Sequence, residues 1–297
     1  MKNVIATLAF VAVSMTATSA FANCPELVNQ LESLAQTGDV EKAGDLAFDI
    51  SLTGGCSKND KRLADYHHAD AYIFQSERTG RLLDVRQLRK ISRIARSWRV
   101  SKALGDLYFS DRNMPKAARA FDDALAIAYG GQSRITSTAT LDLLEKRAFQ
   151  ARALSPSYIN TAQSRAIAVT RIKQRVASGE KYSINVPVRF DYNSAELSHE
   201  GRRAAQDIYG QLKSFSEPDV YLIGHTDPSG SNEYNLRLSR LRAESMARFL
   251  TSRNYAGRIR VEGRGENDRF IPAADLHFTE EELHTFDRRV EFVIGNN

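Results

Sequence analysis

The sequence predicts an α + α/β protein, in which a helical domain precedes a small α/β sandwich with the order β-α-β-α-β-β. Through residues 25 to about 150, apolar residues recur every three or four positions, which is typical of amphipathic helices. Alternating or apolar segments typical of strands appear only from about residue 184, with helical segments between them. We therefore expect a helical domain at 23–150, a polar and basic helical linker at 151–183, and an α/β domain at 184–297.

Residues 1–22 have the pattern of a secretory signal peptide. Lys2 precedes an apolar run from Val4 to about Met15, and small residues flank a cleavage site before Asn23. The run is too short to span a bilayer, and a buried N-terminal helix is the less favoured alternative. Lipidation of Cys24 is disfavoured, because Asn23 is not the small residue that a lipoprotein signal places before its cysteine. We expect an exported mature chain that begins near Asn23.

Composition limits the class of protein. The 297 residues are 42% hydrophobic, enough for two ordinary cores, and no second apolar stretch could cross a membrane. The formal net charge of +5 is interpreted as modest and spread along the chain, without the clustered basic patches of a nucleic-acid binder.

The first helical motif lies in the segment WRVSKALGDLYFSDRNMPKAARAFDDALAIAY, residues 98–129. Its diagnostic positions are Leu104, Gly105, Tyr108, Ala117, Phe121 and Ala124. At these spacings the segment resembles a tetratricopeptide repeat, in which two antiparallel helices approach closely at small residues and aromatic rings fill the groove between them. Tyr129 stands where that family usually has proline. An irregular helical bundle with one chance match is the alternative.

A fainter copy of the repeat covers residues 24–57. The compatible positions are Leu27, Leu34, Ala43, Ala47 and Ile50. In the register that this resemblance implies, Cys24 opens the first helix and Cys56 follows the second, so the hairpin brings the only two cysteines together. In an oxidising compartment this arrangement predicts a disulfide, although proximity in a hairpin is also compatible with two free thiols.

The elements expected in the C-terminal half follow one another in a fixed order. They are a strand SINVPVRFDY (183–192), a helix at 198–212, a strand DVYLIGHTD (219–227), a helix at 230–250, a strand RIRVEGRGE (258–266), and a strand within FDRRVEFVIG (286–295). The helices are expected on one face of the sheet. Between the last two strands we expect a short helix, with Thr279 and Glu282 as a capping box and Phe278 against Leu283.

The helix at 230–250 carries many arginines. At about 100° per residue, Arg237, Arg240 and Arg248 share a solvated stripe, whereas Arg242 projects from nearly the opposite side. That second stripe contains Asn235, Ser239, Met246 and Phe249. A guanidinium that points toward the core needs an anion nearby, from the protein, a ligand or both. Asp227, in the turn before the helix, is the local candidate.

The motifs FDYNSAEL, GHTDPSGSNEYNLRLSRLRAESM, GRGE and DRRVEF appear in this order between residues 190 and 292. In these residues the C-terminal half resembles the OmpA-like peptidoglycan-binding domain. The resemblance implies non-covalent binding of the diaminopimelate side chain of the cell-wall stem peptide, without chemistry on it. Carried across by motif, the binding aspartate is Asp227 and the binding arginine is Arg242. At position 287, Asp287 replaces the family's usual asparagine and is expected to alter affinity or pair with Arg289.

Five further residues are candidates for the same site. Asn235 lies two helical turns before Arg242 on the same face, and Thr226 directly precedes Asp227. The resemblance adds Phe190, Asp191 and Asn193, which match the stretch that forms one wall of the family's site. Each also has an ordinary structural interpretation, such as Asn193 as a turn residue and Phe190 as core.

Enzymatic interpretations have little support in the sequence. The six histidines are scattered, and no metal-ligand spacing, nucleophile elbow or phosphate-binding loop appears. We therefore expect a periplasmic, cell-wall-associated scaffold of a Gram-negative bacterium, without cofactor or metal, whose helical repeats recruit an envelope protein. An exported hydrolase that remodels the wall is the alternative.

Overall fold

The protein is described by a computed structural model, which covers residues 23–130, 137–157, 182–191, 194–214, 217–273 and 276–294. The predicted signal peptide and most of the predicted linker lie outside these residues. Within the described ranges, no helix has both the length and the apolar character needed to cross a bilayer.

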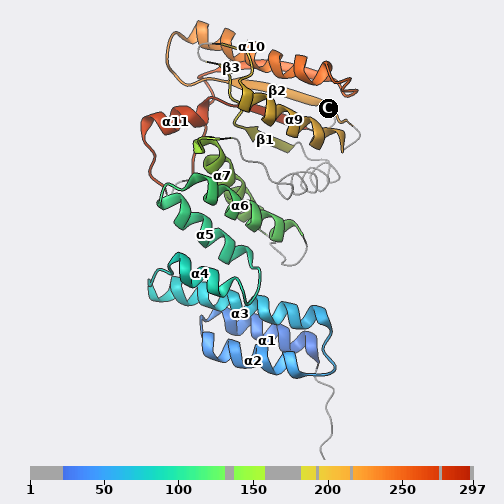
Figure 1. The fold of residues 1–297 in the computed structure, drawn as a ribbon, viewed down its shortest axis with the longest axis vertical. Helices are drawn as coiled ribbons and strands as arrows, with labels where there is room; N and C mark the ends of the chain where they lie inside the picture. The colour runs from blue at the N-terminus through green and yellow to red at the C-terminus, as the bar shows by residue number, and fades with distance from the viewer. Residues whose placement is uncertain are drawn as a thin grey trace, which may run out of the picture.

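The N-terminal half is helical throughout its described residues (Figure 1). Its helices are α1 (Cys24–Gln36), α2 (Val40–Leu52), α3 (Lys58–Thr79), α4 (Val85–Ile91), α5 (Trp98–Ser110), α6 (Met114–Tyr129) and α7 (Thr138–Leu154). Side-chain caps fix several starts: the Asp39 carboxylate accepts from the Lys42 N–H, and Ser57 forms a capping box with Asp60. The α7 helix continues past residue 150, so the helical region extends into the segment expected to be linker.

The α5–α6 hairpin has the close approach that its motif predicts. A Cβ atom added at Gly105 would lie 2.5 Å from the Phe121 ring, so only glycine lets the two helices meet here. Ala117, Phe121 and Ala124 have no exposed surface. The helical hairpin is therefore present, whereas its membership of the tetratricopeptide family stays a prediction.

The predicted pairing of the two cysteines is also present. Cys24, at the start of α1, forms a disulfide with Cys56, just after α2, and their Cα atoms are 5.4 Å apart. Both residues are buried in a cluster that includes Leu31 and Ile50, so the disulfide joins the ends of the hairpin beside an apolar core.

The C-terminal half contains a four-stranded sheet in the order β1-β4-β2-β3. Its elements are β1 (Tyr182–Val186), α9 (His199–Lys213), β2 (Val220–His225), α10 (Asn232–Thr251), β3 (Ile259–Gly265), α11 (Glu280–Asp287) and β4 (Val290–Ile294). β4 runs antiparallel to β1 and β2, and β2 runs parallel to β3. The predicted α/β order is confirmed, although β1 ends at Val186 and only Phe190 of the following stretch makes an isolated bridge, to Leu197.

The two faces of the sheet differ in character. Leu222, Phe292 and Ile294 point toward α9 and α10 and form one core with Ala204 and Met246. Because side chains alternate along a strand, the neighbouring residues of β2 and β4 lie on the opposite face. That face carries polar groups from every strand, including Asn185, Glu262, Arg289 and Glu291.

The helical half and the sheet half meet at α11 (Figure 1). Phe149 of α7 packs with Phe270 and Phe286, and Phe278 lies edge-on to Phe286 with ring centroids 5.0 Å apart. Arg112, just after α5, forms an ion pair with Glu282 of α11. The predicted capping box of Thr279 and Glu282 starts this helix, so the segment after β3 supplies the contact surface for the helical half.

The positive charge is not spread along the chain, and that sequence interpretation was wrong. The segment 81–96, around α4, holds six arginine or lysine residues and one acidic residue, a net charge of +5 that equals the formal charge of the whole chain. All six cations are exposed. The rest of the chain is therefore neutral overall, and its basic and acidic residues balance.

Candidate functional site

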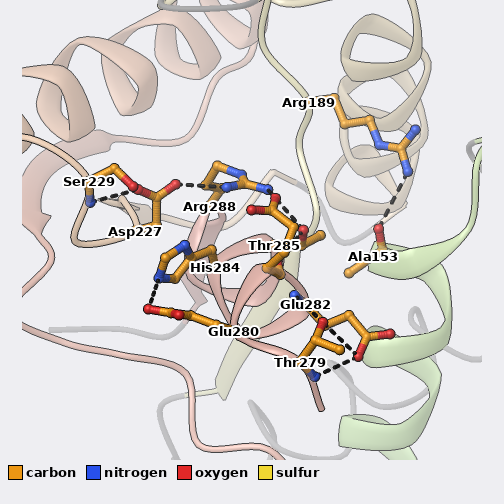
Figure 2. Close-up of polar contacts among 11 residues, drawn as sticks. Ala153, Arg189, Asp227, Ser229, Thr279, Glu280, Glu282, His284, Thr285 and Arg288 are labelled. Carbon is orange, nitrogen blue, oxygen red and sulfur yellow. Dashed lines mark hydrogen bonds and ion pairs between the residues drawn. The ribbon is translucent and has the colours of Figure 1, made fainter.

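Asp227 lies in the turn between β2 and α10, where two donors hold its carboxylate (Figure 2). One oxygen accepts from the Ser229 backbone N–H at 2.9 Å, and the other accepts from Arg288 Nη1 at 2.8 Å. Burial raises the pKa of Asp227, but the hydrogen bonds from Arg288 and Ser229 outweigh it and bring the pKa below its usual value. Asp227 is therefore a fixed anion at neutral pH.

Arg242 lies on the inward stripe of α10, as predicted. Asn235, Ser239 and Met246 of that stripe are buried, whereas Arg237 on the other stripe is exposed. The Arg242 Nε donates to the Ser194 carbonyl at 3.3 Å, and its guanidinium carbon lies 5.1 Å from the centre of the Phe190 ring.

The Arg242 guanidinium has no carboxylate partner among the residues that the structure describes. Burial lowers the pKa of Arg242, and the field of Asp227 opposes this shift without a salt bridge between the two. The Asp227 carboxylate, which the sequence offered as the local partner of Arg242, is paired with Arg288 instead. The terminal nitrogens of Arg242 make no hydrogen bond to a described residue, so its guanidinium can bind an anion.

Close packing of α10 on β2 fixes the separation between the two charges. A Cβ atom at Gly224 would lie 1.9 Å from the Ser239 carbonyl oxygen, so the helix backbone rests directly on the strand. Ser231 caps the helix through the Tyr234 N–H. Arg242 thus lies on a helix packed directly against the sheet, and Asp227 lies in a short turn where Ser229 and Arg288 hold its carboxylate.

The other predicted site residues have varied surroundings. Asn235 is buried and its amide donates to Glu266, so it supports the loop after β3. The Thr226 backbone N–H donates to Gly265, while its buried hydroxyl has no partner among the described groups. Phe190 lies under Arg242, and Asp191 is exposed with its N–H bonded to the Glu196 carbonyl. Asn193 lies outside the described residues.

Sequence reasoning missed the role of Arg288. The motif DRRVEF contains Arg288, but the sequence did not indicate which residues it contacts. In the structure Arg288 bridges Asp227 and Glu281, with Nη2 2.8 Å from the Glu281 carboxylate and 2.9 Å from the Thr285 hydroxyl (Figure 2). Asp287 accepts from Arg269 and the Phe270 N–H, so its side chain does not pair with Arg289. The contacts of Arg288 could not be predicted from that motif, because Glu281 and Thr285 belong to the inserted helix.

A cavity of about 540 Å³ opens beside these charges. Arg242, Arg288 and Phe190 line it on the sheet side, and the end of α7 lines it on the helical side. Arg189 in its wall donates to the carbonyls of Ala153, Ser155 and Pro156, which ties the end of α7 to the C-terminal half (Figure 2). Residues of the helical half therefore form one side of this cavity.

A second polar cluster occupies the opposite face of the sheet. Ligand atoms of His225, Asp268 and Glu291 lie within 4.8 Å of one another, a grouping that scattered sequence positions did not indicate. His225 Nε2 is 3.4 Å from Glu291, and this interaction is the main cause that lowers the pKa of Glu291 to about 2. Arg264 already binds Asp268 at 2.7 Å, and Arg289 adds a second positive charge nearby. These arginines supply the charge that a metal ion would provide, so the cluster is a salt-bridge network.

Comparison with known proteins finds a family match within the C-terminal half. Residues 189–277 match the model of the OmpA family. Outer membrane protein A of Shimwellia blattae is 37% identical over 90 residues, which cover 29% of this chain and 37% of that protein. Outer membrane protein A of Serratia marcescens is 34% identical over 96 residues, covering 31% of this chain and 27% of that protein.

A solved structure is similar over part of this chain. The peptidoglycan-associated lipoprotein from Burkholderia pseudomallei has 26% identity and a TM-score of 0.30, covering 36% of this chain and 86% of that chain. The OmpA family match at residues 189–277 confirms the resemblance that the motifs of the C-terminal half predicted. This chain spans well under half the length of the two outer membrane relatives, and the match does not include the N-terminal helices.

Proposed function

We propose that this protein anchors a helical scaffold to the cell wall by binding the diaminopimelate side chain of peptidoglycan. The observation that carries the proposal is the half-buried Arg242, whose terminal nitrogens have no described partner, in a motif shared with the OmpA family. Diaminopimelate ends in a carbon that bears both an ammonium and a carboxylate. A fixed guanidinium and a fixed carboxylate are the groups that such a zwitterion requires.

The charges around the site suit this ligand. Arg242 and Arg288 are positive and Asp227 and Glu281 are negative, so the set is neutral, like the end of diaminopimelate. A carboxylate has about four acceptor positions, and Asp227 uses two of them for Ser229 and Arg288. It therefore keeps acceptor capacity for the ligand ammonium, while Arg242 receives the ligand carboxylate through a planar fork.

The expected affinity is modest. Each charge-assisted hydrogen bond in a partly buried site contributes about 1.5–3 kcal/mol, and every 1.4 kcal/mol corresponds to about tenfold in affinity. Two such contacts with polar neighbours correspond to micromolar affinity at best. That range suits an anchor on a polymer that repeats its binding group many times.

The remainder of the proposal concerns the helical half. We assign it the task of recruiting an envelope protein, because residues 23–130 lie outside the OmpA family match and fold into helices with their own apolar clusters. The proposed location is the periplasm of a Gram-negative bacterium, with the protein held at the wall. The site as described offers charge recognition and no arrangement for hydrolysis, so a binding role is favoured over the hydrolase alternative.

Sedimentation with two kinds of purified sacculi tests the proposal. In one kind, the third residue of the stem peptide is diaminopimelate. In the other it is lysine, whose side chain ends in an ammonium without the neighbouring carboxylate. The protein is expected to sediment with the diaminopimelate sacculi and to stay in solution with the lysine sacculi at the same polymer concentration. Equal sedimentation with both would overturn diaminopimelate recognition.

A further inference from the structure

The basic segment around α4 borders an apolar groove that the proposed wall site does not use. The groove, of about 500 Å³, has a floor formed by Tyr72, Leu83, Ile91 and Ile94, and Lys90 and Arg93 belong to its lining. We refer to these six residues as the α4 groove. Leu82, which precedes Leu83 of the groove in the sequence, is 83% exposed.

The charges of this region are available to a partner. Lys90 and Arg93 are exposed and form no ion pair or hydrogen bond through their side chains with a described residue. Arg89, by contrast, donates to the Tyr108 hydroxyl, and Arg96 lies 3.5 Å from Asp123. The only acidic residue of the segment 81–96, Asp84, caps α4. The α4 groove thus combines an uncovered apolar floor with positive charge that has no counterion from the described chain.

We propose that the α4 groove binds a short segment of a partner protein in which apolar side chains alternate with aspartate or glutamate. The apolar floor takes the apolar side chains, and Lys90 and Arg93 pair with the flanking carboxylates. We favour a protein segment over a membrane surface because the apolar residues of the groove form a concave floor of about 500 Å³, which inserted side chains can fill. The inference rests on the recruiting half of the proposed function and supplies the chemistry of the partner.

The groove is accessible while the wall site is occupied. In Figure 1, α4 lies on the helical half, on the far side of α5, α6 and α7 from the sheet. No residue of the α4 groove lines the cavity at Arg242. The two sites can therefore be tested separately in the full chain.

Site-specific photocrosslinking in cells tests the proposal. A benzoylphenylalanine replaces Leu82, which is exposed and next in sequence to Leu83 of the groove. The same residue at Phe48 on α2, which is 63% exposed, is the matched control. We expect a protein adduct from position 82 and not from position 48. After proteolysis, mass spectrometry of the adduct should identify a partner segment with apolar residues flanked by acidic ones.

Charge reversal provides the second arm of the experiment. Lys90→Glu with Arg93→Glu should lower the yield of the adduct about tenfold, because the pairing carboxylates are then repelled. Lys58→Glu with Arg62→Glu, an equal charge change near the start of α3, should leave it unchanged. Circular dichroism checks folding of both variants, and both should still sediment with diaminopimelate sacculi, which separates this proposal from the wall site. A lipid adduct, an adduct segment without acidic residues, no adduct above the control, or a yield that resists charge reversal would each overturn it.

Discussion

Removing the Cys24–Cys56 disulfide should destabilise the N-terminal helices by about 4 kcal/mol. The crosslink closes a loop with a sequence separation of 32. In the chain-entropy treatment, a loop of that length restricts the unfolded chain by about 12 cal/mol/K, or about 3.7 kcal/mol at 25 °C. Because both sulfurs are buried beside Leu31 and Ile50, replacing the cysteines would also disturb packing. Comparing the oxidised and reduced forms of the same sequence avoids this complication.

The assay is urea denaturation of the mature chain, followed by circular dichroism at 222 nm with and without reductant. The reduced protein is expected to unfold its helical half at a lower urea concentration. Reduction should change the binding of the C-terminal half to sacculi only slightly. Sedimentation with sacculi after refolding measures this binding. Thiol titration of the denatured, unreduced protein should find no free cysteine. Two free thiols, or a loss below about 1 kcal/mol on reduction, would refute the reasoning.

Two further substitutions test the packing and the electrostatics. Gly105→Ala should lower the free energy of unfolding by about 1–3 kcal/mol, since the new methyl would overlap the Phe121 ring, and Gly54→Ala, with open space around it, is the matched control in the same denaturation assay. Glu291→Gln should cost at most about 3 kcal/mol at pH 7, because a folded pKa of about 2 in place of 4.5 stabilises the ionised form. That contribution is present above about pH 4.5 and is lost as the pH falls toward 2, so the difference between the two proteins should shrink over this range. A difference that stays constant from pH 7 to pH 2.5 would contradict the assigned role of Glu291.

The fold was predictable where local sequence determines it. The three-to-four periodicity marked the helices, and the small residues of the motif, such as Gly105, predicted the close approach of α5 and α6, which the structure places at the Phe121 ring. The inward direction of Arg242 followed from the helical period alone, because α10 is regular from its cap at Ser231 to its end. The hairpin register predicted that Cys24 and Cys56 lie close together, and the structure shows that they are bonded.

What depends on long-range assembly was not predictable. Asp227 and Arg288 are 61 residues apart, and no pattern within either segment shows that they pair. His225, Asp268 and Glu291 meet only because β2 and β4 are neighbours in the sheet and the loop after β3 folds over them. The net charge of +5 around α4, by contrast, follows from the sequence of residues 81–96 alone.

The central claim is that a shaped site at Arg242, rather than general positive charge, holds the protein to peptidoglycan. The most direct measurement compares Arg242→Ala with Arg237→Ala in sedimentation with diaminopimelate sacculi. The first should reduce binding about 10- to 100-fold, as expected for loss of a charge-assisted contact of about 1.5–3 kcal/mol. The second removes an equal charge from the exposed stripe of the same helix and should leave binding unchanged.

Arg242→Lys should restore binding only in part, because an ammonium keeps the charge but lacks the planar fork. Circular dichroism of all three variants confirms that α10 is intact. A large loss at Arg242 with none at Arg237 is the result predicted here. Equal losses from the two alanine variants would contradict the account, since they would show that the wall recognises net charge and not the geometry of Asp227 and Arg242.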